Sequence, residues 1–207
     1  MKILFYGDSI TDAGRNKEGV GTAKFGFGYV NQIVGRMFER MPAQHEIINT
    51  GISGNRVVDI YARIKRDAWN YSPDVLSILI GVNDVWHEIN YQNGVELDRF
   101  EKVYRMLIED TLRTLPDIKL VIMEPFVLRG TATEEKFDRF EMVYDYAKVA
   151  KKLANEFGLT FVPLQKRLDD AAEKYGAAYI LHDGVHPTVE GATVIANAWL
   201  EAFETLS

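Results

Sequence analysis

Short apolar runs alternate with long amphipathic runs along this chain, and the alternation limits its fold more than any other feature. Five short runs are rich in apolar residues and too brief for ordinary helices: Ile3–Tyr6, Glu46–Asn49, Val75–Ile80, Lys119–Met123 and Thr160–Val162. Their length and composition predict buried β-strands.

Helical spacing separates these runs. Apolar residues recur every three or four positions from Phe100 to Leu115, from Phe140 to Phe157 and from Gly191 to Phe203, and Gly158 is a predicted helix C-cap. Strands that are apolar on both faces, alternating with helices, indicate a parallel sheet covered on both sides, with right-handed crossovers. We therefore expect an α/β protein, a three-layer α/β/α sandwich with a five-stranded parallel sheet. The 207 residues suit a single domain over residues 1–207.

Composition excludes several classes of function. The net charge is −6, with both signs spread along the chain, which argues against nucleic acid or an anionic membrane as a partner. The absence of cysteine excludes disulfides, thiol nucleophiles and cysteine metal sites. No apolar window approaches the length of about 18 residues that a membrane span needs, and the N-terminal apolar run is shorter than a signal-peptide core. We expect a cytoplasmic protein.

Small and polar residues follow the first three predicted strands, at Gly7–Asp12, Asn49–Asn55 and Gly81–Asp84. A fourth polar cluster, His182–Pro187, precedes the last helix. Ligands of such sheets bind at the carboxyl ends of the strands, so we expect these segments to meet at one edge.

The residue types in these segments suit acyl transfer. Ser9 stands where a strand becomes a helix, so that its hydroxyl can project from the edge as a nucleophile once a base removes its proton. His186 is the candidate base, since the ordinary pKa of histidine lies near pH 7. Asp183, three residues earlier on a non-helical turn, can orient the imidazole and stabilise its protonated form.

An oxyanion needs hydrogen-bond donors, and the same segments provide them. The helix N-terminus at Ser9 offers free backbone N–H groups. Gly54 has no side chain to keep its N–H from a reacting carbonyl, and Asn83 can donate from its amide.

Taken singly, each residue also has an ordinary structural interpretation. Ser9 or Asp183 can cap a helix, Asn83 and Asp84 can shape a turn, and Gly54 can be a turn glycine. The combination at one edge is more specific than any member.

The four segments resemble the four sequence blocks of the SGNH hydrolase superfamily, which includes the GDSL-type esterases. Gly7-Asp8-Ser9-Ile10 matches the first block with Ile in place of Leu, and Gly54, Asn83 and the pair Asp183 and His186 match the other three in order. The resemblance covers essentially the whole chain. It implies a flavodoxin-like fold, a triad of Ser9, Asp183 and His186, and an oxyanion hole built from Ser9, Gly54 and Asn83. It implies no metal and no cofactor.

Further segments are similar to bacterial intracellular acetylxylan esterases: Asp8–Arg15, Gly28–Val30, Gly51–Asn55 and Asn83–Trp86. That branch removes acetyl groups from short xylose oligosaccharides, so the resemblance implies an acetylated saccharide as the substrate. Asp8 and Trp86 are candidate residues of the substrate pocket. The branch often assembles, and the apolar residues Trp199 and Phe203 of the last helix suit either the core or a homo-oligomer interface.

Three alternatives stay open at this point. The same triad would serve a lysophospholipase or a thioesterase. A non-enzymatic flavodoxin-like domain would bind phosphate after the first strand, although Asp8 and Asp12 would repel it. Finally, His182, Asp183 and His186 could hold a hydrolytic metal, but Gly184 and Pro187 oppose the helix that a four-residue histidine spacing usually requires.

Overall fold

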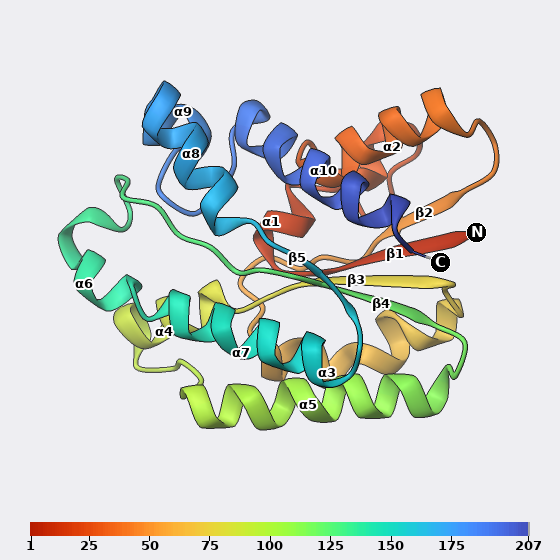
Figure 1. The fold of residues 1–207 in the computed structure, drawn as a ribbon, viewed down its shortest axis with the longest axis horizontal. Coiled ribbons are helices and arrows are strands. Elements are labelled where there is room, and N and C mark those ends of the chain that lie inside the picture. The colour runs from red at the N-terminus through yellow and green to blue at the C-terminus, as the bar shows by residue number, and fades with distance from the viewer. Residues whose placement is uncertain (207) are drawn as a thin grey trace.

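The computed structural model describes residues 1–206, in which five strands form one fully parallel sheet between two layers of helices (Figure 1). The strands are β1 (Lys2–Gly7), β2 (Glu46–Asn49), β3 (Val75–Leu79), β4 (Lys119–Met123) and β5 (Thr160–Val162), in the spatial order β2-β1-β3-β4-β5. The predicted three-layer α/β/α sandwich is confirmed.

Most of the helices divide between the two faces of the sheet (Figure 1). One layer contains α2 (Tyr29–Arg40), α8 (Gln165–Tyr175), α9 (Ala177–Ile180) and α10 (Val189–Glu204); the other contains α3 (Val57–Asp67), α4 (Val82–Tyr91), α5 (Leu97–Thr114) and α7 (Val143–Glu156). Two further four-residue helices, α1 (Ser9–Asp12) and α6 (Phe137–Phe140), and three 3₁₀ turns, η1 (Gly21–Phe25), η2 (Trp69–Tyr71) and η3 (Glu134–Lys136), complete the description. Among the helices of residues 1–206, none combines the length and the hydropathy needed to cross a membrane.

The predicted strand boundaries are accurate to about one residue, whereas one helix differs from its prediction. The apolar periodicity from Phe140 to Phe157 belongs to two helices, because the chain turns at residues 141–142 between α6 and α7. At the far end of α7, Gly158 has a φ of 64° and its N–H donates to the carbonyl of Asn155. That left-handed conformation is the one expected of a C-cap glycine.

The core lies on both faces of the sheet. Ile3 to Tyr6 of β1 have no exposed surface, as expected for a central parallel strand. Trp199 of α10 is also fully buried: its Nε1 donates to Ser77 Oγ at 3.0 Å, and its ring centroid lies 5.0 Å from that of Phe5. Of the two places open to Trp199 from the sequence, it occupies the core.

The strand order explains where a ligand can bind. β1 lies between β2 and β3, and the helices that follow β1 and β2 cover opposite faces of the sheet. The chain connections therefore diverge at β1, which leaves a crevice at the carboxyl ends of these strands. The registers Phe5 with Asn49 and Gly7 with Leu79 bring the three strand ends side by side, as predicted for the polar segments.

Candidate functional site

The turn after β1 presents a serine hydroxyl at the edge of the sheet. Asp8 caps α1, because its Oδ1 accepts the N–H of Ile10 at 3.0 Å. Ser9 therefore does not cap this helix and its hydroxyl is free for another partner. Ser9 Oγ lies 2.9 Å from Nε2 of His186, which is 177 residues away in the sequence.

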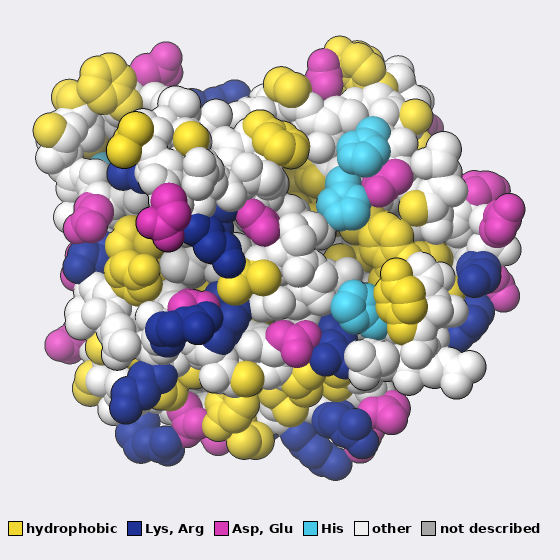
Figure 2. Space-filling model, turned by 180° about the vertical axis from the view of Figure 1, so that it is seen from behind, with side chains coloured by type: hydrophobic (Ala, Val, Ile, Leu, Met, Phe, Trp, Pro, Cys, Tyr) yellow, Lys and Arg dark blue, Asp and Glu magenta, His cyan; other side chains and the backbone are white. Residues whose placement is uncertain are grey.

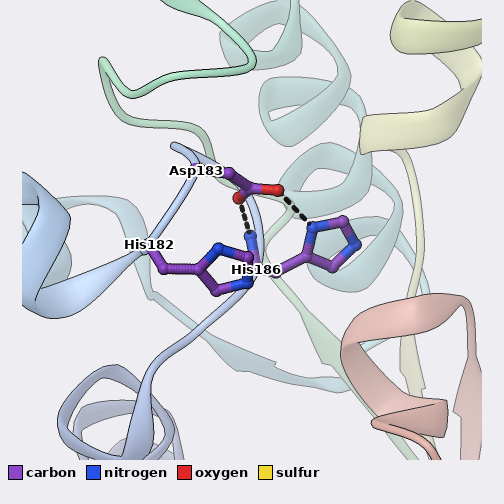
Figure 3. Close-up of side chains that lie close together, drawn as sticks. All are labelled: His182, Asp183 and His186. Atoms are coloured by element: carbon purple, nitrogen blue, oxygen red, sulfur yellow. Dashed lines mark hydrogen bonds and ion pairs between the residues drawn. The ribbon is translucent and has the colours of Figure 1, made fainter.

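A short loop carries His186 and Asp183 together. An antiparallel bridge between Leu181 and Pro187 closes the loop, which is not helical. Asp183 Oδ2 lies 2.7 Å from Nδ1 of His186, and Oδ1 accepts the N–H groups of Val185 at 2.9 Å and of His186 at 2.7 Å. Figure 3 shows the carboxylate reaching both the ring and the backbone of His186. The loop thus fixes the imidazole relative to the acid.

These contacts set the protonation of both groups. The hydrogen bond that the His186 ring donates to the Asp183 carboxylate raises the pKa of His186 above its ordinary value. Burial alone would raise the pKa of Asp183, but its bonds to the His186 ring and to the backbone N–H groups of His186 and Val185 hold that pKa far below its usual range. Asp183 is therefore ionised at neutral pH, and its negative charge stabilises the protonated form of the His186 ring.

The segments after β2 and β3 are tied to each other. Asn83, at the start of α4, donates from Nδ2 to the carbonyl of Asn55 at 3.1 Å, and Asp84 Oδ1 accepts the N–H of Val57 at 3.0 Å. Gly54, just before Asn55, has a φ of 81°, a conformation that favours glycine. Burial raises the pKa of Asp84 well above its usual value. Asp84, for which the sequence suggested only a turn, thus joins the two segments at the edge.

Arg63 of α3 was not predicted as part of this region. Its guanidinium donates to the carbonyls of Gly7 and Thr50 and to Oδ1 of Asn55, which joins the ends of β1 and β2 to the Gly54 segment. One basic residue on an amphipathic helix looks like a surface residue in a sequence. No pattern in the sequence distinguishes it from its neighbours Lys65 and Arg66.

The two candidate pocket residues have different surroundings. Asp8 is fully buried, and its carboxyl, whose Oδ2 has no hydrogen-bond partner within residues 1–206, has a pKa raised by burial to about 7. The Asp8 side chain has no exposed surface and caps the turn that carries Ser9, so a contact between Asp8 and the substrate stays a prediction. Trp86 is partly exposed, and its ring centroid lies 5.8 Å from that of His186.

One group of side chains could hold a metal ion. The ligand atoms of His182, Asp183 and His186 lie within 4.8 Å of one another. The two imidazole rings are stacked nearly parallel, with 17° between their planes and 5.8 Å between their centroids. Nitrogen lone pairs lie in the plane of the ring, so stacked rings do not direct them at one ion. Asp183 and His186 also use their polar atoms in the hydrogen bonds described above. The arrangement therefore suits proton transfer better than metal binding.

Comparison with known proteins shows to which family the chain belongs. Residues 5–194 match the model of the GDSL-like lipase/acylhydrolase family. An acetylxylan esterase of Geobacillus stearothermophilus is 36% identical over 96% of this chain and 92% of its own. A crystal structure of acetylxylan esterase Axe2 from that organism has a TM-score of 0.86 at 35% identity and covers 97% of this chain and 93% of its own.

A second solved structure, described as a GDSL-like lipase from Parabacteroides merdae, has a TM-score of 0.93 at 40% identity and covers 98% of this chain and 95% of its own. The matched range contains the positions of Ser9, Gly54, Asn83, Asp183 and His186. This chain therefore belongs to the GDSL-like lipase/acylhydrolase (SGNH) family and is a carboxylester hydrolase.

Proposed function

We propose that the protein removes acetyl groups from acetylated sugars or xylo-oligosaccharides, with Ser9 as nucleophile, His186 as general base and Asp183 as the acid that orients it. The observation that carries this proposal is the pair of short contacts on the His186 ring. Its Nε2 lies 2.9 Å from Ser9 Oγ while its Nδ1 lies 2.7 Å from Asp183 Oδ2. A hydroxyl, a base and an orienting carboxylate in this sequence form the minimum set for serine-based acyl transfer.

The first half of the reaction forms an acyl-enzyme. Ser9 Oγ attacks the ester carbonyl while Nε2 of His186 takes the hydroxyl proton. The carbonyl oxygen becomes an oxyanion, which accepts hydrogen bonds from the N–H groups of Ser9 and Gly54 and from the Asn83 amide. One Nδ2 hydrogen of Asn83 is bonded to Asn55, so the second remains for the oxyanion. The C–O bond to the sugar then breaks as His186 returns its proton to the leaving oxygen.

The second half releases acetate. Water attacks the acyl carbon and gives a proton to His186, and the second oxyanion uses the same three donors. Ser9 leaves with the proton from His186, which restores the free enzyme. Ionised Asp183 stabilises the protonated imidazole in both halves. No step requires a metal or a cofactor.

Two features support a small acyl group and a sugar as the substrate. The relatives that cover most of this chain include an acetylxylan esterase at 36% identity. Trp86 packs against both His186 and Phe140, with ring centroids 5.8 and 5.7 Å apart. We propose that this bulky, supported indole is a wall of the pocket beside the reacting carbonyl, which limits the length of the acyl chain.

A chain-length series tests this substrate class. We expect high kcat/KM for 4-nitrophenyl acetate and a steep fall beyond about four acyl carbons, together with acetate release from acetylated xylo-oligosaccharides. Rapid cleavage of the octanoate ester without sugar deacetylation would instead establish the lysophospholipase or thioesterase alternative on the same triad. The second alternative, a non-enzymatic phosphate-binding domain, is wrong because the chain is a carboxylester hydrolase.

The pH profile follows from the raised pKa of His186. Only the neutral ring can take the Ser9 proton, so activity is present above the pKa and is lost as the pH falls through it. We expect the acid limb of kcat/KM to have its midpoint above about 6.5, the value of an unperturbed histidine. Initial rates on 4-nitrophenyl acetate from pH 5 to 9 give this midpoint. A midpoint near the ordinary pKa of a carboxyl group would contradict the role of His186.

Asn83→Ala tests the oxyanion hole. We expect kcat to fall by roughly 10²–10³-fold with little change in KM, because the lost amide contacts the transition state more strongly than the substrate. Asn90→Ala is the matched control, since Asn90 is exposed on the same helix, α4. If both variants keep wild-type kcat, Asn83 has no part in stabilising the oxyanion.

A further inference from the structure

A pocket of about 290 Å³ opens directly beside Ser9. Its lining includes Ser9 and His186 together with Phe27, Ser53, His182 and Pro187. An acetyl group has only two carbon atoms and would fill a small part of this volume. The pocket is near the lower end of the range of roughly 300–1,000 Å³ that small-molecule sites occupy, so it has room for a ring-sized group.

The chemistry at His186 determines which half of the ester faces this pocket. After acylation, Nε2 of His186 must give its proton to the oxygen of the leaving alcohol. That oxygen therefore lies next to the imidazole, and the rest of the alcohol extends from it. Because Ser9 and His186 both line the pocket, the alcohol half of the substrate can extend into it from the reacting carbonyl.

One wall of the pocket is an exposed aromatic ring held in place by its neighbours. Phe27 is 73% exposed, so burial of its ring contributes little to the stability of the fold. Its N–H donates to the carbonyl of Ala13 at 3.0 Å. Its ring lies against Gly14, where an added Cβ would meet a ring carbon at 2.5 Å. The flat face is thus kept in position without being covered.

Polar groups occupy the rest of the rim. His182 is exposed and stacked on the catalytic ring of His186, and Ser53 donates its hydroxyl to Asp12 Oδ2 at 2.9 Å, which leaves its oxygen free to accept. Figure 2 shows two adjacent histidine side chains beside a hollow on this face of the molecule. A fatty chain in this pocket would take water from the imidazole and the hydroxyl without replacing their hydrogen bonds, which costs free energy.

We propose that this pocket is a pyranose subsite that holds the sugar from which the acetyl group is removed. The apolar C–H face of the sugar stacks on Phe27, and its hydroxyls form hydrogen bonds with His182 and Ser53. The inference rests on the proposed function, since it takes Ser9 as the nucleophile. It makes Phe27 a residue that determines which alcohol the enzyme accepts.

The test compares two acetate esters that differ only in the alcohol. Methyl 2-O-acetyl-β-xylopyranoside can reach the Phe27 ring, whereas the ethyl group of ethyl acetate is too small to do so. For Phe27→Ala we expect kcat/KM on the acetylated xyloside to fall roughly tenfold, mainly through KM. The value for ethyl acetate, measured by pH-stat, should change by less than a factor of about two.

Matched variants make the result specific to the flat ring. Phe38→Ala removes another exposed phenylalanine, on α2, and should leave both substrates unaffected. Phe27→Leu keeps apolar bulk and should lose the sugar preference, whereas Phe27→Trp should retain it. In Ser9→Ala protein, which cannot turn over, an NMR titration with the xyloside should show weaker binding once Phe27→Ala is added.

The two possible failures give different results. If the wild type deacetylates the xyloside and Phe27→Ala changes both esters equally or neither, the subsite is wrong while the proposed function stands. If the wild type hydrolyses ethyl acetate but not the acetylated xyloside, the proposed sugar substrate fails and the subsite fails with it.

Discussion

Replacing Ser9 by alanine will lower kcat on 4-nitrophenyl acetate by roughly 10⁴–10⁶-fold. The variant keeps the oxyanion donors but has no oxygen 2.9 Å from Nε2 of His186 to form the acyl-enzyme. Its fold should persist, because Asp8 rather than Ser9 caps α1. Steady-state kinetics and a thermal melt of both proteins measure the two parts of this prediction.

A fluorophosphonate, which reacts covalently with an activated serine, tests the same residue. The wild-type protein should gain one phosphonyl group by mass spectrometry and lose its activity, and Ser9→Ala should gain none. Ser72→Ala is the matched control, since Ser72 is exposed and precedes β3, at the opposite end of the sheet. Wild-type turnover by a folded Ser9→Ala protein would eliminate the mechanism.

Replacing Asp183 by asparagine will lower kcat by roughly 10⁴-fold, although the side chain hardly changes in size. The reason is specific to this loop. Oδ1 accepts two backbone N–H groups, from Val185 and His186, so the amide oxygen of asparagine has to occupy that position. Its NH₂ group then faces Nδ1 of His186 and donates to it. The ring is forced to carry its proton on Nε2, where it can no longer accept the proton of Ser9.

The pH dependence and a surface variant check this reading of Asp183→Asn. Without the carboxylate, the pKa of His186 loses the contact that raises it most, so the residual activity should persist to lower pH than in the wild type. Asp170→Asn removes an exposed acid on α8 that pairs with Lys166, and should keep full activity. An Asp183→Asn protein with wild-type kcat would exclude the orienting role of this acid.

The sequence predicted the sheet because strand and helix periods differ clearly and because parallel strands are apolar on both faces. It also placed Ser9, Asn83 and His186 at one edge, since strand ends of a parallel sheet converge. The division of one predicted helix into α6 and α7 was missed because the apolar spacing continues across the turn at residues 141–142.

Residues that act through long-range contacts were not predictable in this way. Arg63 joins three segments through two backbone carbonyls and Oδ1 of Asn55, and no sequence pattern marks such contacts. The complete burial of Asp8 could not be predicted from its place beside Ser9 in the sequence. Its carboxyl is buried beneath the turn. The glycine-rich segment from Lys17 to Phe27 predicts a surface loop beside the site, but the exposure of the Phe27 ring depends on how the segment after Ala13 folds back.

The bridge between Leu181 and Pro187 has a consequence for how this chemistry can be re-engineered. Asp183 and His186 lie on one closed loop of about seven residues, whereas Ser9 stands in α1, directly after β1. The distance between Asp183 and His186 is therefore fixed within the loop. The distance between Ser9 and His186 depends instead on how the loop packs against the sheet. In another protein, the same loop would keep the contact between Asp183 and His186, whereas its flanking segments would decide the distance from His186 to a serine.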